Sequence, residues 1–282
     1  MLQFSCNTKL LFDRGRCIMI NEAIRSSFDI RDYSIVAEKE FPETFECEGV
    51  PTVKNQGDHP TCVAHAVSSV LEYHYNKQHS KARKFSTQFI YGFRDFGYYV
   101  GDGMMTRDAL KTVQKHGDPF YSDCPGNSDY ADAEKALSEN IEELLVKASN
   151  HTITTYFRCS SPEEIKTALM NYGPVVMAMN FAGNIVDDMY VPDDSKGGGH
   201  CMFIYGWIEK GWLIQNSWGN RYAGDGRFTL PYDVKFTEAW GVTDEVVEDE
   251  SMIKKPTKVA LILYKIYNKI ANFILDIIHN DR

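Results

Sequence analysis

The chain has 282 residues, of which 43% are hydrophobic, 13% aromatic and 24% charged, and its formal net charge is −9. This composition is typical of a globular protein with a substantial core, and at roughly 100–200 residues per domain the length allows one large domain or two small ones. The acidic balance argues against the basic face of a nucleic-acid-binding protein, so no nucleic-acid partner is expected. The aromatic content argues against a disordered chain.

The seven cysteines are an odd number and include no Cys-x-x-Cys pair. At least one thiol is therefore unpaired within the chain, which favours a reducing compartment over a secreted disulfide scaffold. The N-terminal sequence MLQFSCNTKLLFDRGRC is interrupted by polar and charged side chains and lacks the apolar core of a signal peptide. No run of about 18 uncharged apolar residues occurs either. We therefore expect an intracellular location.

The first 40 residues are expected to form a variable arm or short pro-segment, with a short helix near residues 20–27. The strongest predicted element is a helix from Cys62 to about Lys77, because its apolar residues recur at the spacing of one helical face. Asp58 and Thr61 are candidates for its N-terminal cap. The sequence thus places a cysteine in the first turn of a helix.

Further helices and then short strands are predicted along the chain. The helices are expected over about 105–116, 130–147 and 161–173, the last with Pro162 at its first helical position. After Pro174 the pattern changes to short β-prone runs at 175–180, 201–207, 211–215 and 227–230. Helices followed by strands favour a two-lobed α+β protein over alternating βαβ units.

The C-terminal part has a different character. Residues 244–250 carry five acidic and no basic side chains, so residues 244–257 are expected to be a solvated linker. Residues 258–278 have an amphipathic helical pattern with a narrow polar stripe that includes Lys265 and Lys269. We expect this C-terminal helix, within 258–282, to pack on its own domain or on a second copy of the chain. Contact with a membrane surface is the alternative, because basic residues lie beside a wide apolar face.

Three short motifs contain the candidate chemistry. They are Gln56-Gly57 before Cys62, three glycines before His200 at an apolar strand, and Asn216-Ser217-Trp218-Gly219 after the next strand. A thiol at a helix N-terminus faces the positive end of the helix dipole, which favours the nucleophilic thiolate. A histidine can take the thiol proton, an asparagine oxygen can orient that histidine, and a side-chain amide can donate to an oxyanion.

The order Gln56, Cys62, His200 and Asn216, with separations of 6, 138 and 16 residues, resembles the papain-like cysteine proteases. The resemblance covers about residues 41–240 and includes the Ser-rich turn within Phe85-Ser86-Thr87-Gln88-Phe89. It implies an α+β fold with a helical left lobe, a small antiparallel β-barrel-like right lobe and the active cleft between them. The peptidase domain is expected to span residues 41–243.

The resemblance also implies a role for each residue of the catalytic set. Cys62 is expected to be the nucleophile and His200 the general acid and base. Asn216 is expected to orient His200, and Gln56 to donate to the oxyanion together with the Cys62 backbone N–H. Trp218 would shield the bond between Asn216 and His200 from water.

Substrate contacts are expected on a glycine-containing loop. Gly101 and Gly103 fall where the family pairs with peptide backbone, and Met105 is expected to line an apolar pocket. The expected partners are protein or peptide substrates. The resemblance implies no cofactor and no metal.

The sequence departs from the family in three respects. The family's second cysteine, three residues before the nucleophile, is replaced by His59, and its disulfide partner by Gly101, so this bridge is expected to be absent. Val63 and His65 replace the usual aromatic residues behind the nucleophile, without removing a catalytic group. An arm of 40 residues is also shorter than the family's inhibitory pro-segment, which leaves control by a pro-segment open.

Three alternatives to a peptidase remain open. A catalytically silent papain-like protein could bind peptides or a partner, although such proteins commonly lose the nucleophile. The same residues could serve an amidase, a transpeptidase or a deubiquitinase-like enzyme. Cys62 and His65, three residues apart, could join His200 and Cys201 in a zinc site. That last hypothesis leaves Gln56 and the Asn216 motif without a role, so the peptidase is preferred.

Overall fold

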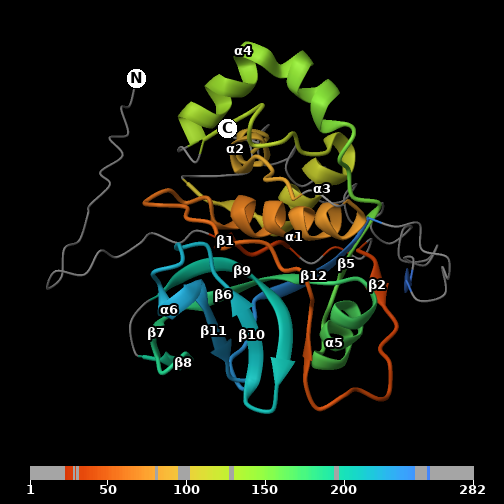
Figure 1. Ribbon diagram of the computed structural model, residues 1–282, viewed down its shortest axis with the longest axis vertical. Coiled ribbons are helices and arrows are strands. Elements are labelled where there is room, and N and C mark those ends of the chain that lie inside the picture. The colour runs from red at the N-terminus through yellow and green to blue at the C-terminus, as the bar shows by residue number, and fades with distance from the viewer. Residues whose placement is uncertain are drawn as a thin grey trace, which may run out of the picture.

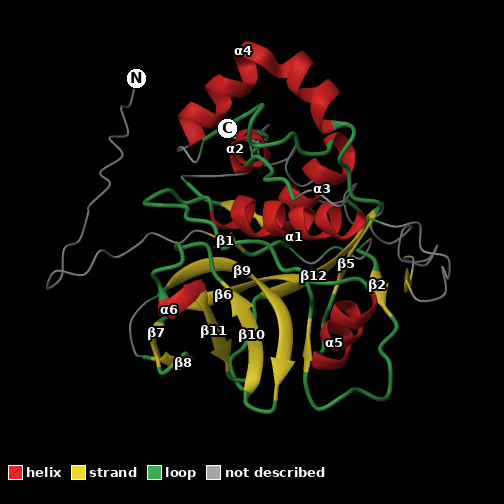
Figure 2. Ribbon diagram, in the orientation of Figure 1, coloured by secondary structure: helices red, strands yellow, loops and turns green. Residues whose placement is uncertain are grey.

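A computed structural model of the chain describes residues 23–27, 29, 32–79, 82–94, 102–126, 130–193, 197–244 and 253–254. The expected helix over 258–278 lies outside the described residues, and so does Gly101. Most of the helices gather in one half of the molecule, and a curved sheet forms most of the other (Figures 1 and 2). The two-lobed α+β expectation is confirmed.

The helical half is built around a central helix, α1. The helices are α1 (Cys62–Gln78), α2 (Thr87–Gly92), α3 (Thr106–His116), α4 (Tyr130–Ala148), α5 (Pro162–Asn171) and the short α6 (Ala223–Gly226). Every residue of α1 from Cys62 to His74 is buried, so other parts of the chain surround this part of the helix on all sides. The helices α2 and α3 pack against α1 and α4 packs against α2, whereas α5 packs beside the sheet (Figure 1).

The sheet half is a long and largely antiparallel sheet. Its strands are β2 (Ser34–Ile35), β3 (Phe45–Glu46), β5 (Thr155–Arg158), β6 (Val175–Phe181), β7 (Gly183–Val186), β8 (Met189–Pro192), β9 (Gly198–Ile208), β10 (Gly211–Gln215), β11 (Arg227–Leu230), β12 (Glu238–Thr243) and β13 (Ile253–Lys254). Their order is β13-β2-β5-β12-β6-β9-β10-β11-β8-β7, and β3 also pairs with β9. No closed barrel is detected among the described strands.

Two further short strands form a separate pair between the halves. They are β1 (Ala23–Ile24) and β4 (Met104–Met105), and they run parallel, with Ala23 opposite Met104 and Ile24 opposite Met105. Because Ala23 and Ile24 are extended, the prediction of a helix near residues 20–27 is wrong for its described part. These residues pair instead with β4, which is distant in the sequence, and helical spacing cannot reveal such a partner.

Most predicted elements are confirmed with small shifts at their ends. The predicted start of α1 is correct, but Thr61, its N-cap residue, makes no side-chain capping bond. Ser161 caps α5 as expected, because its hydroxyl oxygen accepts a hydrogen bond from the Glu164 N–H at 3.2 Å. Only β6, β9, β10 and β11 were predicted among the strands, and the other described strands were not. The β2 strand also places part of the expected arm within the main sheet.

Candidate active site

Cys62 lies at the first turn of α1, where the helix meets the sheet. Its side chain is fully buried and belongs to an apolar cluster that also contains Cys201 of β9. Burial, with the Cys62 thiol as the next contribution, raises the pKa of the Cys201 thiol, so these two side chains lie within electrostatic reach. Because Cys201 follows His200, the packing of α1 against β9 brings the expected nucleophile to the strand that carries the expected base.

His200 is held by Asn216 from the loop that follows β10. His200 Nε2 and Asn216 Oδ1 are 2.7 Å apart. Asn216 Oδ1 also accepts a hydrogen bond from the Ser217 backbone N–H at 2.7 Å. Since a backbone N–H can only donate, the Asn216 atom in this contact must be oxygen, and His200 Nε2 must therefore carry the hydrogen. This arrangement leaves Nδ1, the nitrogen that can exchange a proton, without a hydrogen-bond partner in the described structure.

Aromatic rings enclose the bond between His200 and Asn216. The Trp218 ring stacks on the His200 imidazole, with centroids 4.6 Å apart and 23° between the planes. Phe181 of β6 meets both rings edge-on, at 5.6 Å from His200 and 5.2 Å from Trp218. Tyr222 packs edge-on against the other side of Trp218 at 4.7 Å. Trp218, which was predicted to shield this bond from water, lies against His200, and Phe181 and Tyr222 are neighbours that were not predicted.

The environment of His200 favours the neutral imidazole. The side chain is completely buried, and burial lowers the pKa of His200 to about 4, although the hydrogen bond to Asn216 raises it. Removing a charged imidazolium from water costs free energy, and one neutral oxygen partner offsets only part of that cost. His200 is therefore set to accept a proton at neutral pH, provided that a negative charge forms beside it.

Gln56 is tied to the loop that carries Asn216. Its side-chain oxygen accepts a hydrogen bond from the Ser217 hydroxyl at 2.6 Å, and its backbone N–H donates to the Ser217 carbonyl at 2.8 Å. The Gln56 amide nitrogen donates to the His59 carbonyl at 2.9 Å. These three bonds orient the side-chain amide and leave its second N–H for another acceptor. Ser217 is a positioning residue that the sequence motif contained but that was not singled out.

The segment before Gln56 is anchored to α1 by a buried ion pair. Lys54 Nζ lies 2.8 Å from Glu72 Oε1, and the Glu72 side chain is 2% exposed. The same Glu72 oxygen accepts the Phe85 backbone N–H at 2.8 Å, and Lys54 also donates to the Ser68 hydroxyl. A buried carboxylate with several donors is a rigid anchor, because moving it would expose unpaired charge in the interior. The segment that carries Gln56 is thereby held at a constant distance from the start of α1.

Two of the expected substrate-binding residues, Gly103 and Met105, lie just before β4 and within it. Gly103 has a φ of +92°, a left-handed conformation that favours glycine, and its N–H and carbonyl contact the Tyr91 hydroxyl and Arg94. Met105 lies in β4, on the edge that pairs with β1. The structure therefore places both residues between the halves, but it shows no contact that tests their role in substrate binding.

His65 lies one turn after Cys62 on α1 and is packed in the interior. Its Nδ1 lies 2.9 Å from the Thr61 carbonyl, and burial lowers the pKa of His65 to about 3. Within the described ranges, no group of three or more His, Cys, Asp or Glu side chains is placed to hold a metal ion. The hydrogen bond to Thr61 gives His65 a structural contact within its own helix.

Comparisons with known proteins agree with this geometry. Among curated proteins, the viral cathepsin of Cydia pomonella granulosis virus is 23% identical over 226 residues, which are 74% of this chain and 64% of the relative. The viral cathepsin of Choristoneura fumiferana nuclear polyhedrosis virus is 26% identical over 205 residues, 70% of this chain and 60% of that protein. The chain thus spans less than two thirds of the length of these relatives.

Solved structures show the same fold. Xylellain, a cysteine protease from Xylella fastidiosa, matches with a TM-score of 0.70 and 25% identity, covering 84% of this chain and all of xylellain. Digestive procathepsin L 3 from Tenebrio molitor matches with a TM-score of 0.60 and 17% identity, covering 80% of this chain and 76% of that structure. The second match supports the fold alone.

Two observations complete the description. No helix in the described part of the chain is long and apolar enough to cross a membrane. The sequence profile of the papain family of cysteine proteases matches residues 39–249, which is well over half of the chain. The chain belongs to the papain family of cysteine proteases.

Proposed function

We propose that this chain is a cysteine endopeptidase in which Cys62 attacks the peptide carbonyl and His200 serves as general acid and base. The observation that carries the proposal is the 2.7 Å bond between His200 Nε2 and Asn216 Oδ1. This bond commits one imidazole nitrogen to an orienting partner and leaves the other for proton exchange with a thiol. Membership of the papain family supports protein or peptide substrates.

The proposed reaction begins when the Cys62 thiol gives its proton to His200 Nδ1. The sulfur then attacks the carbonyl carbon of the substrate, and the resulting oxyanion accepts hydrogen bonds from the second Gln56 side-chain N–H and the Cys62 backbone N–H. Collapse of this intermediate breaks the carbon–nitrogen bond, and His200 returns the proton to the leaving amine. A water molecule, deprotonated by His200, then hydrolyses the thioester and regenerates the Cys62 thiol.

The other described thiols supply an internal control. Burial raises the pKa of Cys47 to about 12 and raises the pKa of Cys124, Cys159 and Cys201 above the usual value for a thiol. These four thiols are therefore protonated at neutral pH and are poor nucleophiles. A reagent that needs an activated cysteine should distinguish Cys62 from all of them.

The test combines labelling with turnover. The full chain is incubated at neutral pH with an epoxysuccinyl peptide, the adduct is located by mass spectrometry, and hydrolysis of fluorogenic peptides is measured in parallel. We expect one adduct, on Cys62, and we expect His200→Ala to reduce both labelling and kcat/KM by roughly 10²–10⁴-fold, the usual contribution of a general base. Cys62→Ala should abolish turnover, while Cys159→Ala, which alters another buried thiol, should retain it.

Two results would contradict the proposal. Comparable hydrolysis by Cys62→Ala would exclude Cys62 as the nucleophile. A peptide that binds the folded chain without cleavage, together with an unlabelled Cys62, would favour the catalytically silent binding protein instead. The intact set of Gln56, Cys62, His200 and Asn216 supports the enzyme over that alternative.

A further inference from the structure

A cavity of about 270 Å³ lies beside α1, and its lining includes none of the residues assigned to catalysis. It is formed by the segment that leads to Gln56, by α1, by residues 84–87 and by the loop that contains Tyr121 and Gly126. Ligand cavities in proteins measure about 300–1,000 Å³, so this one suits a small ligand. Its lining includes Val53, Lys54, His65, Lys84, Phe85 and Tyr121.

His65 supplies a hydrogen-bond acceptor to this cavity. Burial and the neighbouring Lys54 lower the pKa of His65 to about 3, so the imidazole is neutral at pH 7. Its Nδ1 lies 2.9 Å from the Thr61 carbonyl, which can only accept, so Nδ1 carries the hydrogen and Nε2 carries a lone pair. Nε2 has no hydrogen-bond partner among the described residues, although the side chain is only 3% exposed. A buried acceptor of this kind is rarely left without a donor.

Lys54 supplies a positive donor close to that acceptor. Its ammonium group has three N–H bonds, of which one is directed to Glu72, 2.8 Å away, and one to the Ser68 hydroxyl. The third N–H has no partner among the residues that the structure describes. The effect of Lys54 on the pKa of His65 shows that the two side chains lie within electrostatic reach of each other.

The charges around the cavity favour a negatively charged ligand. Lys54 and the exposed Lys84 both line it. Glu72 balances one of these two positive charges. Asp118, another acid within electrostatic reach of Lys54, has its pKa raised by burial, which favours its neutral form. The remaining positive charge can be balanced by a ligand oxyanion, and hydrogen bonds from ammonium groups to oxyanions are among the strong ones in proteins.

The rest of the lining accepts an apolar group. Phe85 forms part of it and is 1% exposed, and Val53 lies beside Lys54 in the segment that leads to Gln56. The Tyr121 side chain is 45% exposed, and its backbone N–H donates to the Lys84 carbonyl at 2.7 Å. An aromatic ring and a lysine are thus held next to each other on the wall of the cavity.

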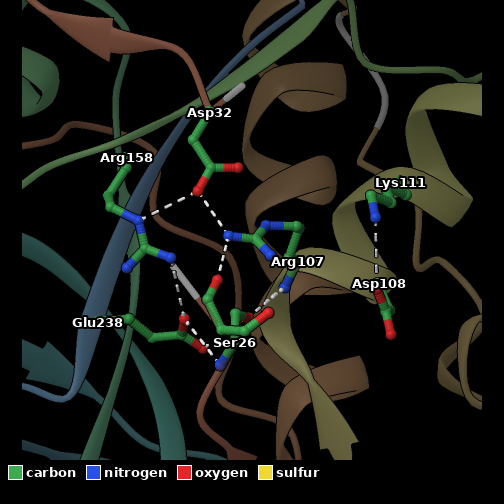
Figure 3. Close-up of polar contacts among 8 residues, drawn as sticks. Ser26, Asp32, Arg107, Asp108, Lys111, Arg158 and Glu238 are labelled. Atoms are coloured by element: carbon green, nitrogen blue, oxygen red, sulfur yellow. Dashed lines mark hydrogen bonds and ion pairs between the residues drawn. The ribbon is translucent and has the colours of Figure 1, made fainter. Parts of the chain in front are cut away.

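A second group of buried charges shows what a self-sufficient cluster looks like (Figure 3). Asp32 Oδ2 lies 2.5 Å from Arg107 Nη2 and 3.4 Å from Arg158 Nε. Arg158 Nη2 lies 3.8 Å from Glu238 Oε2. Each charged group there has an opposite charge within the chain, so no ligand is needed. The cavity differs, because a lone pair of His65 and an N–H of Lys54 have no such partner.

We propose that this cavity binds a carboxylate with a neighbouring amide N–H, which is the chemistry of an N-acylated amino acid or of the C-terminal residue of a peptide. The carboxylate accepts hydrogen bonds from Lys54 and Lys84, and the amide N–H donates to His65 Nε2. The side chain of the ligand packs on Phe85 and Tyr121. The site is separate from the candidate active site, and its occupation does not require peptidase activity.

The first test locates the ligand in the full chain. The chain is labelled with ¹⁵N at its histidines and titrated with N-acetylphenylalanine, and the side-chain nitrogens are observed by NMR. A hydrogen bond to the Nε2 lone pair changes the chemical shift of that nitrogen, so we expect the His65 signal to move and the His200 signal to stay in place. Movement of His200 alone would place the ligand in the candidate active site and overturn the proposal. No movement of His65 at millimolar ligand would also overturn it.

The second test compares ligands that each lack one group. N-acetylphenylalanine amide has no negative charge, and O-acetyl phenyllactate has no amide N–H. Calorimetric titration of the unmodified chain should show that each binds about 10-fold or more weakly than N-acetylphenylalanine, because each leaves a buried donor or acceptor without a partner. Equal affinities for the three compounds would contradict the proposed hydrogen bonds.

The third test changes the cavity. His65→Phe removes the acceptor and keeps an aromatic side chain, and His74→Phe makes the same change at a buried position of α1 outside the cavity. We expect His65→Phe to weaken binding of N-acetylphenylalanine by about 10-fold or more and His74→Phe to leave it unchanged. Equal effects of the two substitutions, in folded proteins, would contradict the role of His65.

A variant at an exposed position keeps the proposal testable if His65→Phe does not fold. Lys84→Gln should weaken binding of N-acetylphenylalanine by roughly 2–5-fold, since an exposed charge is partly screened by water. Lys210→Gln, at another exposed lysine away from the cavity, is the control and should leave the affinity unchanged. An affinity that is the same in both variants and in the unmodified chain would count against the proposal.

The two sources of the ligand are distinguished by its length. Acetyl-alanyl-alanyl-phenylalanine is titrated into Cys62→Ala, so that the peptide stays intact, and its affinity is compared with that of N-acetylphenylalanine for the same variant. Equal or tighter binding of the peptide would assign the cavity to peptide C-termini. Binding of N-acetylphenylalanine alone would assign it to free acylated amino acids. Binding of neither compound would overturn the proposal.

Discussion

His200 is oriented by residues close to it in the sheet, whereas Cys62 depends on contacts between distant parts of the chain. Asn216 lies sixteen residues after His200, and Trp218 covers both from the same loop. Cys62 begins a buried helix without a side-chain cap, and Gln56 beside it is oriented by Ser217, 161 residues away. The residues that orient His200, here called the base side, are thus close to it in the sequence. The residues around Cys62, here called the nucleophile side, are brought together only by the tertiary fold.

This difference predicts which kind of change abolishes activity on each side. The base side should lose activity through loss of a single hydrogen bond, while its strands remain paired. The nucleophile side should lose activity whenever the segment around Gln56 moves relative to the loop around Ser217. The following predictions test that contrast, from the largest expected effect to the smallest.

Gln56→Ala should have the largest effect among the residues that support Cys62 and His200. It removes a proposed oxyanion donor, and loss of one such donor costs about 10²–10³-fold in kcat. The matched control is Gln78→Ala, the same change at an exposed position near the end of α1. Steady-state kinetics on a fluorogenic peptide provide the measurement. A change confined to KM would show that Gln56 acts in substrate binding alone.

Asn216→Ala should have a smaller effect on the same assay. A hydrogen bond to a charged group contributes about 1.5–3 kcal/mol, so loss of the bond to the His200 imidazolium should lower kcat about 10–150-fold. Asn171→Ala, which removes an exposed bond to Glu38, is the control. Thermal unfolding should show that Asn216→Ala remains folded. An unchanged kcat would mean that Trp218 and Phe181 alone orient His200.

Stability should fall as the pH falls from 7 to 5, because buried histidines are kept neutral. Burial lowers the pKa of His65 to about 3 and the pKa of His74 and of His200 to about 4. The unfolded chain, with histidine pKa values near 6.5, binds these protons first, so folding loses stability below about pH 6.5 and down to about pH 4. Each histidine contributes about 1.4 kcal/mol per pH unit in that window.

One buried acid opposes this trend. Burial raises the pKa of Asp118 well above its usual range, so the folded chain holds a proton there that the unfolded chain releases. This proton opposes the effect of the three protons that His65, His74 and His200 bind only in the unfolded chain. Urea unfolding at pH 7 and pH 5 measures the net dependence. His74→Gln should reduce the slope by about the contribution of one histidine. A free energy of unfolding that does not change between these pH values would show that the histidines are not buried as the structure places them.

Local patterns were sufficient to predict much of the fold and part of the site. Helical spacing and capping residues placed α1, α3, α4 and α5 within a few residues, because helix hydrogen bonds are made within one segment. The motifs around His200 and Asn216 identified a pair that the structure joins at 2.7 Å. The short strands β1, β4 and β12 were missed, since each is stabilised by a partner far away in the sequence.

The amino-acid sequence by itself determined which residues carry the candidate chemistry and on which local elements they lie, because residue type, helical spacing and short motifs act over a few neighbours. Only the tertiary structure decided how those residues are covered. Ser26 meets Glu238 across 212 positions, and Ala23 fills the space beside Gly199. Such contacts depend on how the two halves close around residues 23–27, and no local pattern of charge or hydrophobicity specifies that arrangement.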